Sequence, residues 1–524
     1  MRKLFALLAI ASAAYGNELS YKTLQSGPNG TTTPIYDHGI HGEGQIIAFL
    51  DTGVDPTSCY FVEPDGRAPV INTRVDQTAV DLSRRKIIAY DFLYSCDAFP
   101  NARGCDDPNS PAGYDNQGHG THAAASAAGD RATPIAHDYG DAIATGAKIV
   151  VQDAGYIGGD LCTSRPGIGC PVNITPILNQ AYLQGARIDS NSWGDGQGSP
   201  IPPTANYPQS AHDVDAFVYS HPDMLVVFNT GNFGSTGIAP PGTVSAPGCA
   251  KNTLQVGGTR TETHYADDAI STFTLMGPTR DGRIKPDVVG PAVVMAGDSS
   301  YVSNGQTCST TFQPGTSWAS PTIAGAAALV RQYYTDGFYP TGVATPAHAI
   351  TPSAALLKAT IIASARQVPY IVTNDGLQPA KPVPSNEQGW GFPVLGDILY
   401  FPGNSAQLHV VDNASLAQGQ TSMLHFNVKQ GTPLKVFLVW TDPAGGSLVN
   451  DLDLSVIDPS GAQLARADHV NNVEGVTVAT PLAGTYTIAV SAPRISQGAA
   501  QTYALVVSGD IGDSQPGRVR AARH

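Results

Sequence analysis

Apolar strand patterns and helical patterns alternate along the first two thirds of the chain. Apolar runs at 46–50, 148–152 and 224–228 are typical of strands buried in a sheet. Small and apolar residues recur at helical spacing between and after these runs, most clearly at 319–334 and 353–364. Strands that alternate with helices predict a parallel α/β sheet between about residues 45 and 365.

The pattern changes after Pro402, where helical spacing gives way to short runs of β-forming residues separated by Gly, Pro, Asn and Asp. These runs lie at 408–411, 422–428, 434–440, 452–457, 485–490 and 503–508. They predict an all-β sandwich of about a hundred residues. We therefore expect an α/β domain over residues 17–404, a β-sandwich over 405–509 and a loose tail over 510–524.

Residues 1–16 have the pattern of a secretory signal peptide. Arg2 and Lys3 precede an apolar run at 4–14, and small residues follow up to Gly16. We expect cleavage after Gly16 and a secreted, extracellular protein. No later segment is long and apolar enough in sequence to span a bilayer, so we expect no membrane partner.

Acidic residues outnumber basic ones by 43 to 29, which gives a formal net charge of −14. This balance favours solubility and argues against a nucleic-acid partner. Seven cysteines in an exported chain predict disulfide bonds with one thiol left over. A bond between Cys249 and Cys308 would leave Cys59 free, although any of these cysteines could instead be a small buried apolar residue. Two local pairs are also expected, Cys96 with Cys105 and Cys162 with Cys170.

Three short segments bring Asp, His and Ser into the chain in that order. They are Asp51-Thr52-Gly53, His119-Gly120-Thr121-His122 and Gly315-Thr316-Ser317-Trp318-Ala319-Ser320-Pro321. A hydroxyl nucleophile needs an imidazole base and a carboxylate that holds the imidazole in one tautomer. A lone Asp-Thr-Gly is more often a structural turn, and His-Gly-Thr-His alone could be a pair of metal ligands. Their joint occurrence with the serine segment indicates catalysis.

The expected elements give each of the three residues a suitable place. Asp51 follows the strand at 46–50, at the carboxyl end where open α/β sheets place their sites. His119 begins a stretch of small residues that lets a helix pack closely against the sheet. Ser317 begins the helix at 319–334, whose N-terminal partial charge favours an alkoxide. We predict Asp51 as the orienting carboxylate, His119 as the base and Ser317 as the nucleophile.

On these segments the sequence resembles the subtilisin-like serine proteases, the subtilases, whose triad has the same chain order. The resemblance implies a subtilisin-like catalytic domain and a serine endopeptidase that works through an acyl-enzyme and requires no cofactor for its chemistry. The segment at 226–234 resembles the one whose Asn completes the oxyanion hole, which implies Asn232 and not Asn229 as the donor. The expected partners are protein or peptide substrates, and we expect a monomer.

The segment at 187–194 resembles the family's substrate-binding strand, which implies that Ser192, Trp193 and Gly194 pair with an extended peptide by β-augmentation. No acidic residue stands out among these three, so we expect broad specificity with an apolar side chain at P1, the substrate residue before the cleaved bond. Activity should rise as the pH passes about 6.5 to 7.5, because the base must be neutral.

The segments at 436–443 and 448–454 resemble the C-terminal jelly-roll barrel of one subtilase subgroup, the bacterial extracellular alkaline proteases. Side-chain oxygens in this region could bind a structural Ca²⁺, which takes six to eight oxygen ligands. The candidate ligands are Asp442, Asn450, Asp451 and Asp453. Asp451 and Asp453 alternate with leucines, however, so they could instead form the polar face of a strand.

Particular residues disfavour several alternative functions. Carboxyl proteases of similar fold use Glu as the base, which the His119 segment argues against. An inactive homologue that serves as a binding protein is disfavoured by the intact set of Asp51, His119, Ser317 and Asn232. A separate binding role for 405–509 lacks a stripe of exposed aromatic residues, so a stabilising module is expected. We expect His122 to be a buried structural residue and not a metal ligand.

Overall fold

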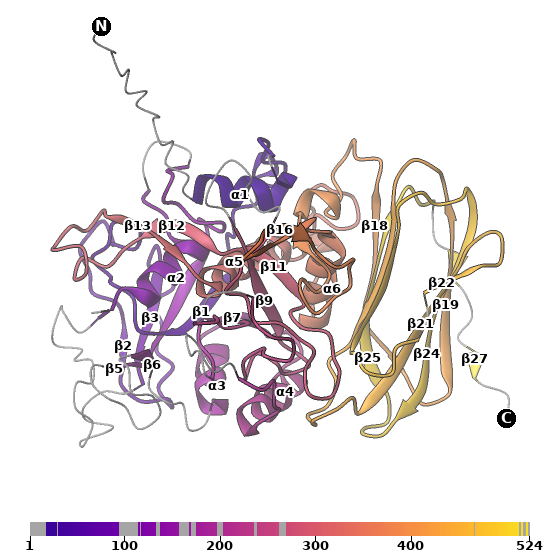
Figure 1. Ribbon diagram of the computed structural model, residues 1–524. Helices are drawn as coiled ribbons and strands as arrows, with labels where there is room; N and C mark the ends of the chain where they lie inside the picture. Colours follow the sequence, from indigo (N-terminus) through magenta and orange to yellow (C-terminus); the bar gives the residue numbers. More distant parts are fainter. Residues whose placement is uncertain are drawn as a thin grey trace, which may run out of the picture.

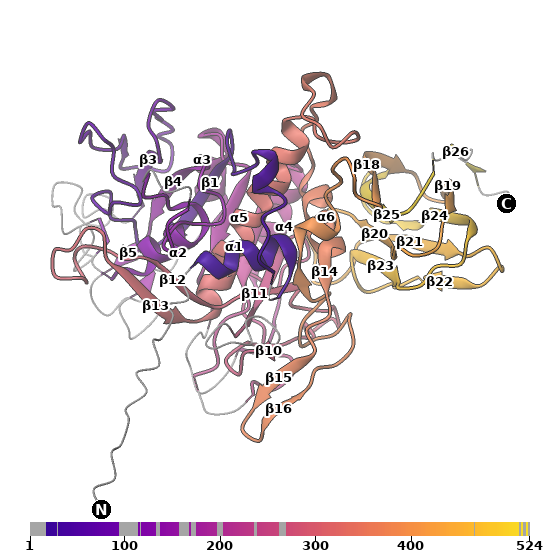
Figure 2. The same ribbon diagram turned by 90° about the horizontal axis from the view of Figure 1, so that it is seen from above.

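A computed structural model of the chain describes most of the 524 residues. The described residues are 17–28, 30–93, 114–115, 117–132, 137–156, 167–168, 174–195, 203–234, 238–260, 269–465, 467–512, 515–516 and 520–521. The expected signal peptide and the two expected local disulfides lie outside them. Figures 1 and 2 show an α/β domain followed by a β-sandwich at its side.

An 11-stranded, mostly parallel sheet forms the centre of the α/β domain. Its strand β1 (Ile46–Asp51) pairs in parallel with β4 (Lys148–Asp153) on one side and with β7 (Ile188–Asn191) on the other. The side chains of β1 are buried after its first residue, because helices cover both faces of the sheet. The parallel α/β sheet predicted from the sequence is confirmed.

The remaining strands of this sheet are β2 (Ile71–Asn72), β3 (Ile87–Phe92), β8 (Leu225–Asn229), β9 (Leu254–Thr259), β10 (Ala269–Ile270), β11 (Val288–Pro291), β15 (Tyr370–Thr373) and β16 (Gly376–Pro379). In the described part of this domain, three two-stranded antiparallel sheets lie outside it: β5 (Gly155–Tyr156) with β6 (Gly167–Ile168), β12 (Val293–Gly297) with β13 (Thr310–Pro314), and β14 (Ala365–Arg366) with β17 (Phe392–Pro393).

Helices cover the sheet on both sides. Figure 1 shows α2 (His119–Ala128) and α5 (Thr316–Thr335) on one side and α3 (Thr175–Leu183) and α4 (Gln209–Ser220) on the other. The other helical segments are α1 (Asn17–Ser26), α6 (Ala354–Ser364) and the short η1 (Tyr36–His38), η3 (Pro346–His348) and η4 (Leu395–Asp397). None of the described helices has both the length and the apolar character needed to cross a bilayer.

Small residues allow α2 and α5 to lie very close together. A Cβ atom added at Gly325 in α5 would come within 2.8 Å of the Ala127 carbonyl oxygen in α2 and within 2.9 Å of Ile143 Cβ. His119 is the first residue of α2, and Ser317 is the second residue of α5. The contact between these helices therefore sets the spacing of the elements that carry the predicted base and nucleophile.

Two antiparallel sheets form the C-terminal sandwich, as the sequence predicts. One consists of β18 (Gln407–Leu416), β25 (Gln501–Gly509), β20 (Leu434–Val439) and β23 (Val473–Val478). The other consists of β22 (Gln463–Ala465), β21 (Asn450–Ile457), β24 (Gly484–Ile495), β19 (Gln420–Val428), β26 (Gln515–Pro516) and β27 (Arg520–Ala521). Strands β26 and β27 come from the expected tail and pair with β19.

The two central strands of the first sheet, β25 and β20, are buried on both faces. In β20, Val436 and Leu438 belong to the core of the sandwich, whereas Phe437 and Val439 belong to the core of the α/β domain. Successive side chains of a strand point to opposite faces, so one strand serves both cores. Figure 2 shows α6 between the parallel sheet and the sheet that contains β25 and β20.

The cysteine pairing differs from the expected one. A disulfide joins Cys59 to Cys308, whose Cα atoms are 5.1 Å apart, and Cys249 is a buried free thiol. The expected bond between Cys249 and Cys308 is therefore wrong. Cys59 and Cys308 are separated by 249 positions, and the fold brings the β12–β13 hairpin to the loop after β1.

We expect Gly325→Ala to lower both stability and activity. Overpacking against the Ala127 backbone costs about 1–3 kcal/mol, which outweighs the gain of about 1 kcal/mol in helix propensity. Thermal unfolding and kcat/KM for a peptide substrate measure the two effects. Gly446→Ala is the matched control, because a Cβ at Gly446 meets nothing closer than 3.7 Å. Equal behaviour of the two variants would contradict the role of this helix contact.

Candidate active site

Five segments far apart in the sequence meet at the carboxyl end of the parallel sheet. Asp51 is the last residue of β1, and His119 begins α2. Ser317 lies in the first turn of α5, beside Ser192, which follows β7. Asn232 follows β8 and accepts a hydrogen bond from the first turn of α5. The crossover connections of the sheet therefore bring these five predicted residues to one place.

Asp51 and His119 are joined by a hydrogen bond of 2.7 Å between His119 Nδ1 and Asp51 Oδ1. The Thr52 backbone N–H donates to the same oxygen at 2.8 Å. Because a carboxylate oxygen only accepts, the proton of a neutral His119 lies on Nδ1, and Nε2 is left as the acceptor. Asp51 is buried, whereas the His119 side chain is 31% exposed and can reach a substrate.

The pKa of His119 is raised above its ordinary value of 6.5. Burial alone lowers this pKa, but the negative charge of Asp51 and the hydrogen bond to it outweigh burial. The nearby Asp115 carboxylate adds to the effect. The imidazole is thus a stronger base than a free histidine.

Asp115 is a site residue that the sequence reasoning missed. Its carboxylate accepts hydrogen bonds from the backbone N–H groups of Gly118 and Thr121, both at 2.8 Å, and from the Thr121 hydroxyl at 2.6 Å. The Thr52 hydroxyl also donates to it, at 3.1 Å. Burial raises the pKa of Asp115 to about 7. An acidic residue just before a helix is a common N-terminal signal, and it could have identified this position.

Gly120 allows the Asp51 and His119 segments to touch. A Cβ at Gly120 would overlap the carbonyl oxygen of Gly53. The Gly120 N–H donates to the Thr52 hydroxyl at 2.9 Å. The two motifs are therefore one structural unit, which requires a glycine at position 120.

Ser317 is buried at the start of α5. Its hydroxyl donates to the Ser192 carbonyl at 3.2 Å, and the Ser192 hydroxyl donates to the Ser317 carbonyl at 2.7 Å. Among the described residues, no hydrogen bond joins this hydroxyl to His119. Catalytic hydrogen bonds are often unformed without substrate, so this geometry is compatible with a nucleophile.

Asn232 presents its amide nitrogen beside the Ser317 backbone. Its Oδ1 accepts from the Thr316 N–H at 2.8 Å and from the Thr316 hydroxyl at 2.9 Å, which fixes the orientation of the amide. The position of a Cβ on Gly315 lies 3.6 Å from Asn232 Nδ2 and 3.8 Å from Ser317 N. Trp318 Nε1 also lies 3.5 Å from this position. Three N–H groups thus border one small space, and an oxyanion hole requires donors of this kind. Asn229 is buried, and its amide donates to the Thr316 hydroxyl at 3.3 Å.

The segment Ser192, Trp193 and Gly194 lies next to these donors. Trp193 is partly exposed, its indole N–H donates to Asn191 Oδ1 at 3.0 Å, and its ring meets Phe228 edge to face at 5.3 Å. A Cβ at Gly194 would come within 2.6 Å of Ser245 Oγ. The backbone of this segment is therefore held in place on the side of Ser317.

Trp318 and His122 pack behind the predicted base. The Trp318 ring lies 4.8 Å from the His119 ring and 4.1 Å from the His122 ring, and Trp318 is 3% exposed. His122 is buried, and its Nε2 is 3.1 Å from the Thr311 carbonyl oxygen. Burial lowers the pKa of His122 to about 4. The expectation that His122 is a buried structural residue is confirmed.

The four residues predicted as calcium ligands separate into two groups. Asp442 Oδ2 accepts from Lys251 Nζ at 2.6 Å in a buried ion pair, and the Asn450 side-chain oxygen accepts from two backbone N–H groups. Asp451 and Asp453 lie together on β21. Burial and the charge of Asp451 raise the pKa of Asp453. The oxygens of Asp442 and Asn450 are thus already engaged in protein contacts.

Comparisons with known proteins identify the family of this chain. Residues 42–391 match the model of the subtilase family, and residues 424–492 match that of the bacterial pre-peptidase C-terminal domain. The chain is 24% identical to the serine protease/ABC transporter B family protein tagA of Dictyostelium discoideum, in an alignment that covers 94% of this chain and 32% of tagA. It is 25% identical to the related tagD of the same organism, over 85% of this chain and 30% of tagD.

Serine protease AprX of Bacillus subtilis is 32% identical over 18% of this chain and 24% of AprX. The chain thus spans about a third of the length of the Dictyostelium relatives, 32% of tagA and 30% of tagD. Among solved structures, a serine protease of Aeromonas sobria aligns with a TM-score of 0.41 and 13% identity, covering 94% of this chain and 95% of that one.

We expect the acidic limb of the kcat/KM profile to have an apparent pKa above 6.5, because the neutral form of His119 is required and its pKa is raised. Asp51→Asn should lower this apparent pKa by removing the charge that raises it. The same variant should lower kcat about 10⁴-fold, since the imidazole loses its orienting partner. Rates measured from pH 5 to pH 9 test both effects. An activity maximum near pH 4 would contradict them.

We expect hydrogen peroxide to leave most of the activity intact. The residue after the nucleophile is Trp318, whereas a methionine there would become a bulky polar sulfoxide on oxidation. Trp318→Met should therefore make the enzyme sensitive to peroxide. Residual activity over a peroxide time course compares the two proteins. Inactivation of the wild type as fast as of Trp318→Met would refute the idea.

Proposed function

Since the chain belongs to the subtilase family and is a serine endopeptidase, we propose that Asp51, His119 and Ser317 carry out its peptide hydrolysis. The observation that carries this proposal is the 2.7 Å hydrogen bond between Asp51 and His119 beside the start of α5. Asn232 Nδ2 and the Ser317 backbone N–H are proposed as the oxyanion donors. Hydrolysis in this family requires no cofactor.

In the proposed mechanism the Ser317 oxygen attacks the carbonyl carbon of the scissile bond. The Ser317 proton moves to His119 Nε2, while Asp51 stabilises the imidazolium that forms. The negative charge on the substrate oxygen is met by the two oxyanion donors, each worth about 10²–10³ in kcat. His119 then gives its proton to the departing amine, which leaves Ser317 acylated. A water molecule, deprotonated by His119, releases the acid and restores the serine.

We propose that the backbone of Ser192, Trp193 and Gly194 binds the substrate as an added strand. The aromatic pair of Trp193 and Phe228 supports an apolar P1 preference. Secretion is proposed from the pattern of residues 1–16, and a monomeric state also stays a prediction. A calcium ion at Asp442, Asn450, Asp451 and Asp453 likewise stays a prediction. Because the oxygens of Asp442 and Asn450 already accept hydrogen bonds, the candidate ligands that remain are Asp451 and Asp453.

Casein hydrolysis by the wild type and by Ser317→Ala tests the mechanism. We expect kcat to fall about 10⁶-fold with unchanged thermal unfolding, the loss known for the nucleophile of subtilisin. A fluorophosphonate should label Ser317 in the wild type. Ser320→Ala is the matched control, because Ser320 lies one turn further along α5 and donates to the Asn191 carbonyl. Labelling that survives in Ser317→Ala, or is lost in Ser320→Ala, would overturn the assignment.

A peptide library tests the proposed specificity. We expect Phe, Leu or Met to be favoured at P1, because the pocket segment offers apolar surface. Asp195 directly follows this segment, so Asp195→Asn is the informative variant if a basic P1 residue is selected instead. Strong selection for Arg or Lys in the wild type would refute the apolar preference.

A further inference from the structure

Two carboxylates and an imidazole converge on the outer side of the C-terminal sandwich. Asp451 and Asp453 are alternate residues of β21, so they lie on the face opposite to Leu452 and Leu454, which belong to the sandwich core. His469 reaches them from the segment between β22 and β23. One potential ligand atom from each of Asp451, Asp453 and His469 lies within 4.8 Å of the other two.

One carboxylate oxygen of Asp451 and one of Asp453 lack a hydrogen-bond donor among the described residues. Asp451 is 5% exposed, and its Oδ1 is buried without a hydrogen-bond partner among the described residues. Its Oδ2 lies 2.9 Å from His469 Nδ1. Asp453 Oδ1 is also buried without a hydrogen bond and lies 3.5 Å from the same nitrogen. Buried carboxylate oxygens are costly unless a donor or a cation satisfies them.

Among the described residues, His469 is the one basic side chain within ion-pair distance of these carboxylates. The carboxylates of Asp468 and Glu474 lie in the same region, and in the described part of the chain no Lys or Arg forms an ion pair with these two residues or with the cluster. Arg494 is the neighbour of Asp451 across the strands, but its guanidinium donates to backbone carbonyls of residues 448 and 449. The arrangement is therefore complementary to a cation.

We propose that Asp451, Asp453 and His469 bind a zinc ion or a chemically similar divalent transition metal. His469 Nδ1 and one oxygen of each aspartate would be the three protein ligands, with water completing the coordination. Zinc accepts such a mixture of imidazole and carboxylate ligands. Calcium prefers six to eight oxygens and does not favour imidazole, so the cluster fits zinc better than the calcium predicted from the sequence.

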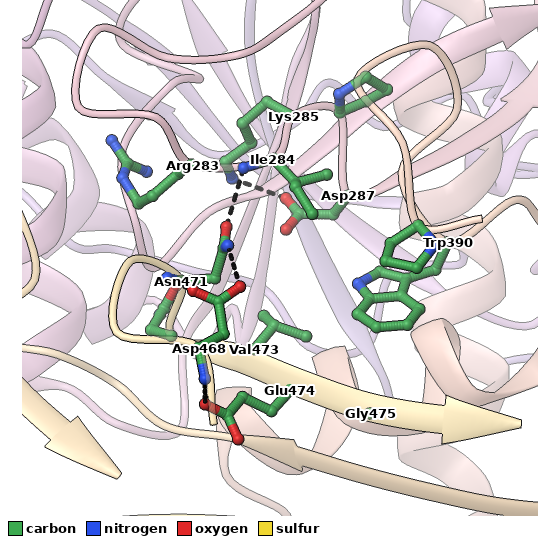
Figure 3. A pocket seen from close by; sticks show the side chains of 13 residues that line it. Arg283, Ile284, Lys285, Asp287, Trp390, Asp468, Asn471, Val473, Glu474 and Gly475 are labelled. Carbon is green, nitrogen blue, oxygen red and sulfur yellow. Dashed lines mark hydrogen bonds and ion pairs between the residues drawn. The ribbon is translucent and has the colours of Figure 1, made fainter. Parts of the chain in front are cut away.

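The position of His469 gives the ion a structural role. The segment at 467–472 also contacts the α/β domain, because Asn471 Oδ1 accepts from the Ile284 N–H at 2.8 Å. Asn471 in turn donates to Asp468 at 2.6 Å, and the Asp468 N–H donates to Glu474 at 2.6 Å. Figure 3 shows this chain of bonds beside a cavity of about 170 Å³ between the domains. A metal ion on His469 would fasten this segment to β21 and so stabilise the contact between the domains.

Metal binding is measured on the full chain carrying Ser317→Ala, which prevents autolysis, after treatment with a chelator. Calorimetry with zinc chloride should show one site, and zinc should raise the melting temperature by a few degrees. His469→Ala and Asp453→Asn should each weaken zinc binding at least tenfold. The visible absorbance of bound Co²⁺ should disappear in His469→Ala, a change that a purely structural role would not produce.

His212→Ala is the matched control. His212 is exposed and lies 3.5 Å from a single carboxylate, Asp213, so its loss should leave zinc affinity unchanged. Absence of zinc binding, or equal zinc binding in His469→Ala and the wild type, would overturn the proposal. Calcium binding that depends on Asp451 and Asp453 without zinc binding would also overturn it, in favour of an oxygen-only site. None of these outcomes depends on the proposed peptidase mechanism.

Discussion

The close packing of α2 against α5 is the constraint on which the active site depends. Both helices begin at the site, one with His119 and the other with Thr316 and Ser317. Their separation is set where Gly325 faces the Ala127 backbone, two to three turns away from the reacting groups. Protein interiors are closely packed, so a displacement at this contact would shift both helices along their length. The spacing of base and nucleophile is thus a property of the helix pair and not of the loops that precede it.

A buried polar network then fixes the orientation of the groups that the helices bring together. Asp115 accepts hydrogen bonds from the first turn of α2 and from Thr52, while Asp51 is hydrogen-bonded to His119. Two carboxylates so close to one imidazole both raise its pKa. The networks differ in purpose: the bonds of Asp115 stay within the scaffold, and those of Asp51 reach the reactive ring. Fully satisfied networks of this kind rigidify a site.

Features encoded locally were predictable from the sequence, and features encoded by distant contacts were not. The strand before Asp51 and the helix after Ser317 follow from short patterns, because burial of one segment shows in its own residues. The bond between Cys59 and Cys308 does not, since only the fold brings these positions together. The Lys251–Asp442 ion pair likewise joins residues 191 positions apart. A lone Asp442 therefore looked like a metal ligand.

Burial of strand β20 on both faces makes the C-terminal sandwich part of the catalytic domain's core. A strand with one solvent-exposed face alternates apolar and polar residues, but β20 is buried at every position. Phe437 and Val439 face the α/β domain. Dissociation of the sandwich would therefore expose these two side chains to solvent, together with the surface of α6 that they cover. The Lys251–Asp442 pair adds little net stability, since burial of two charges costs nearly what their attraction returns. It instead penalises any other docking, which would leave each charge buried alone, and thereby selects one arrangement of the two domains.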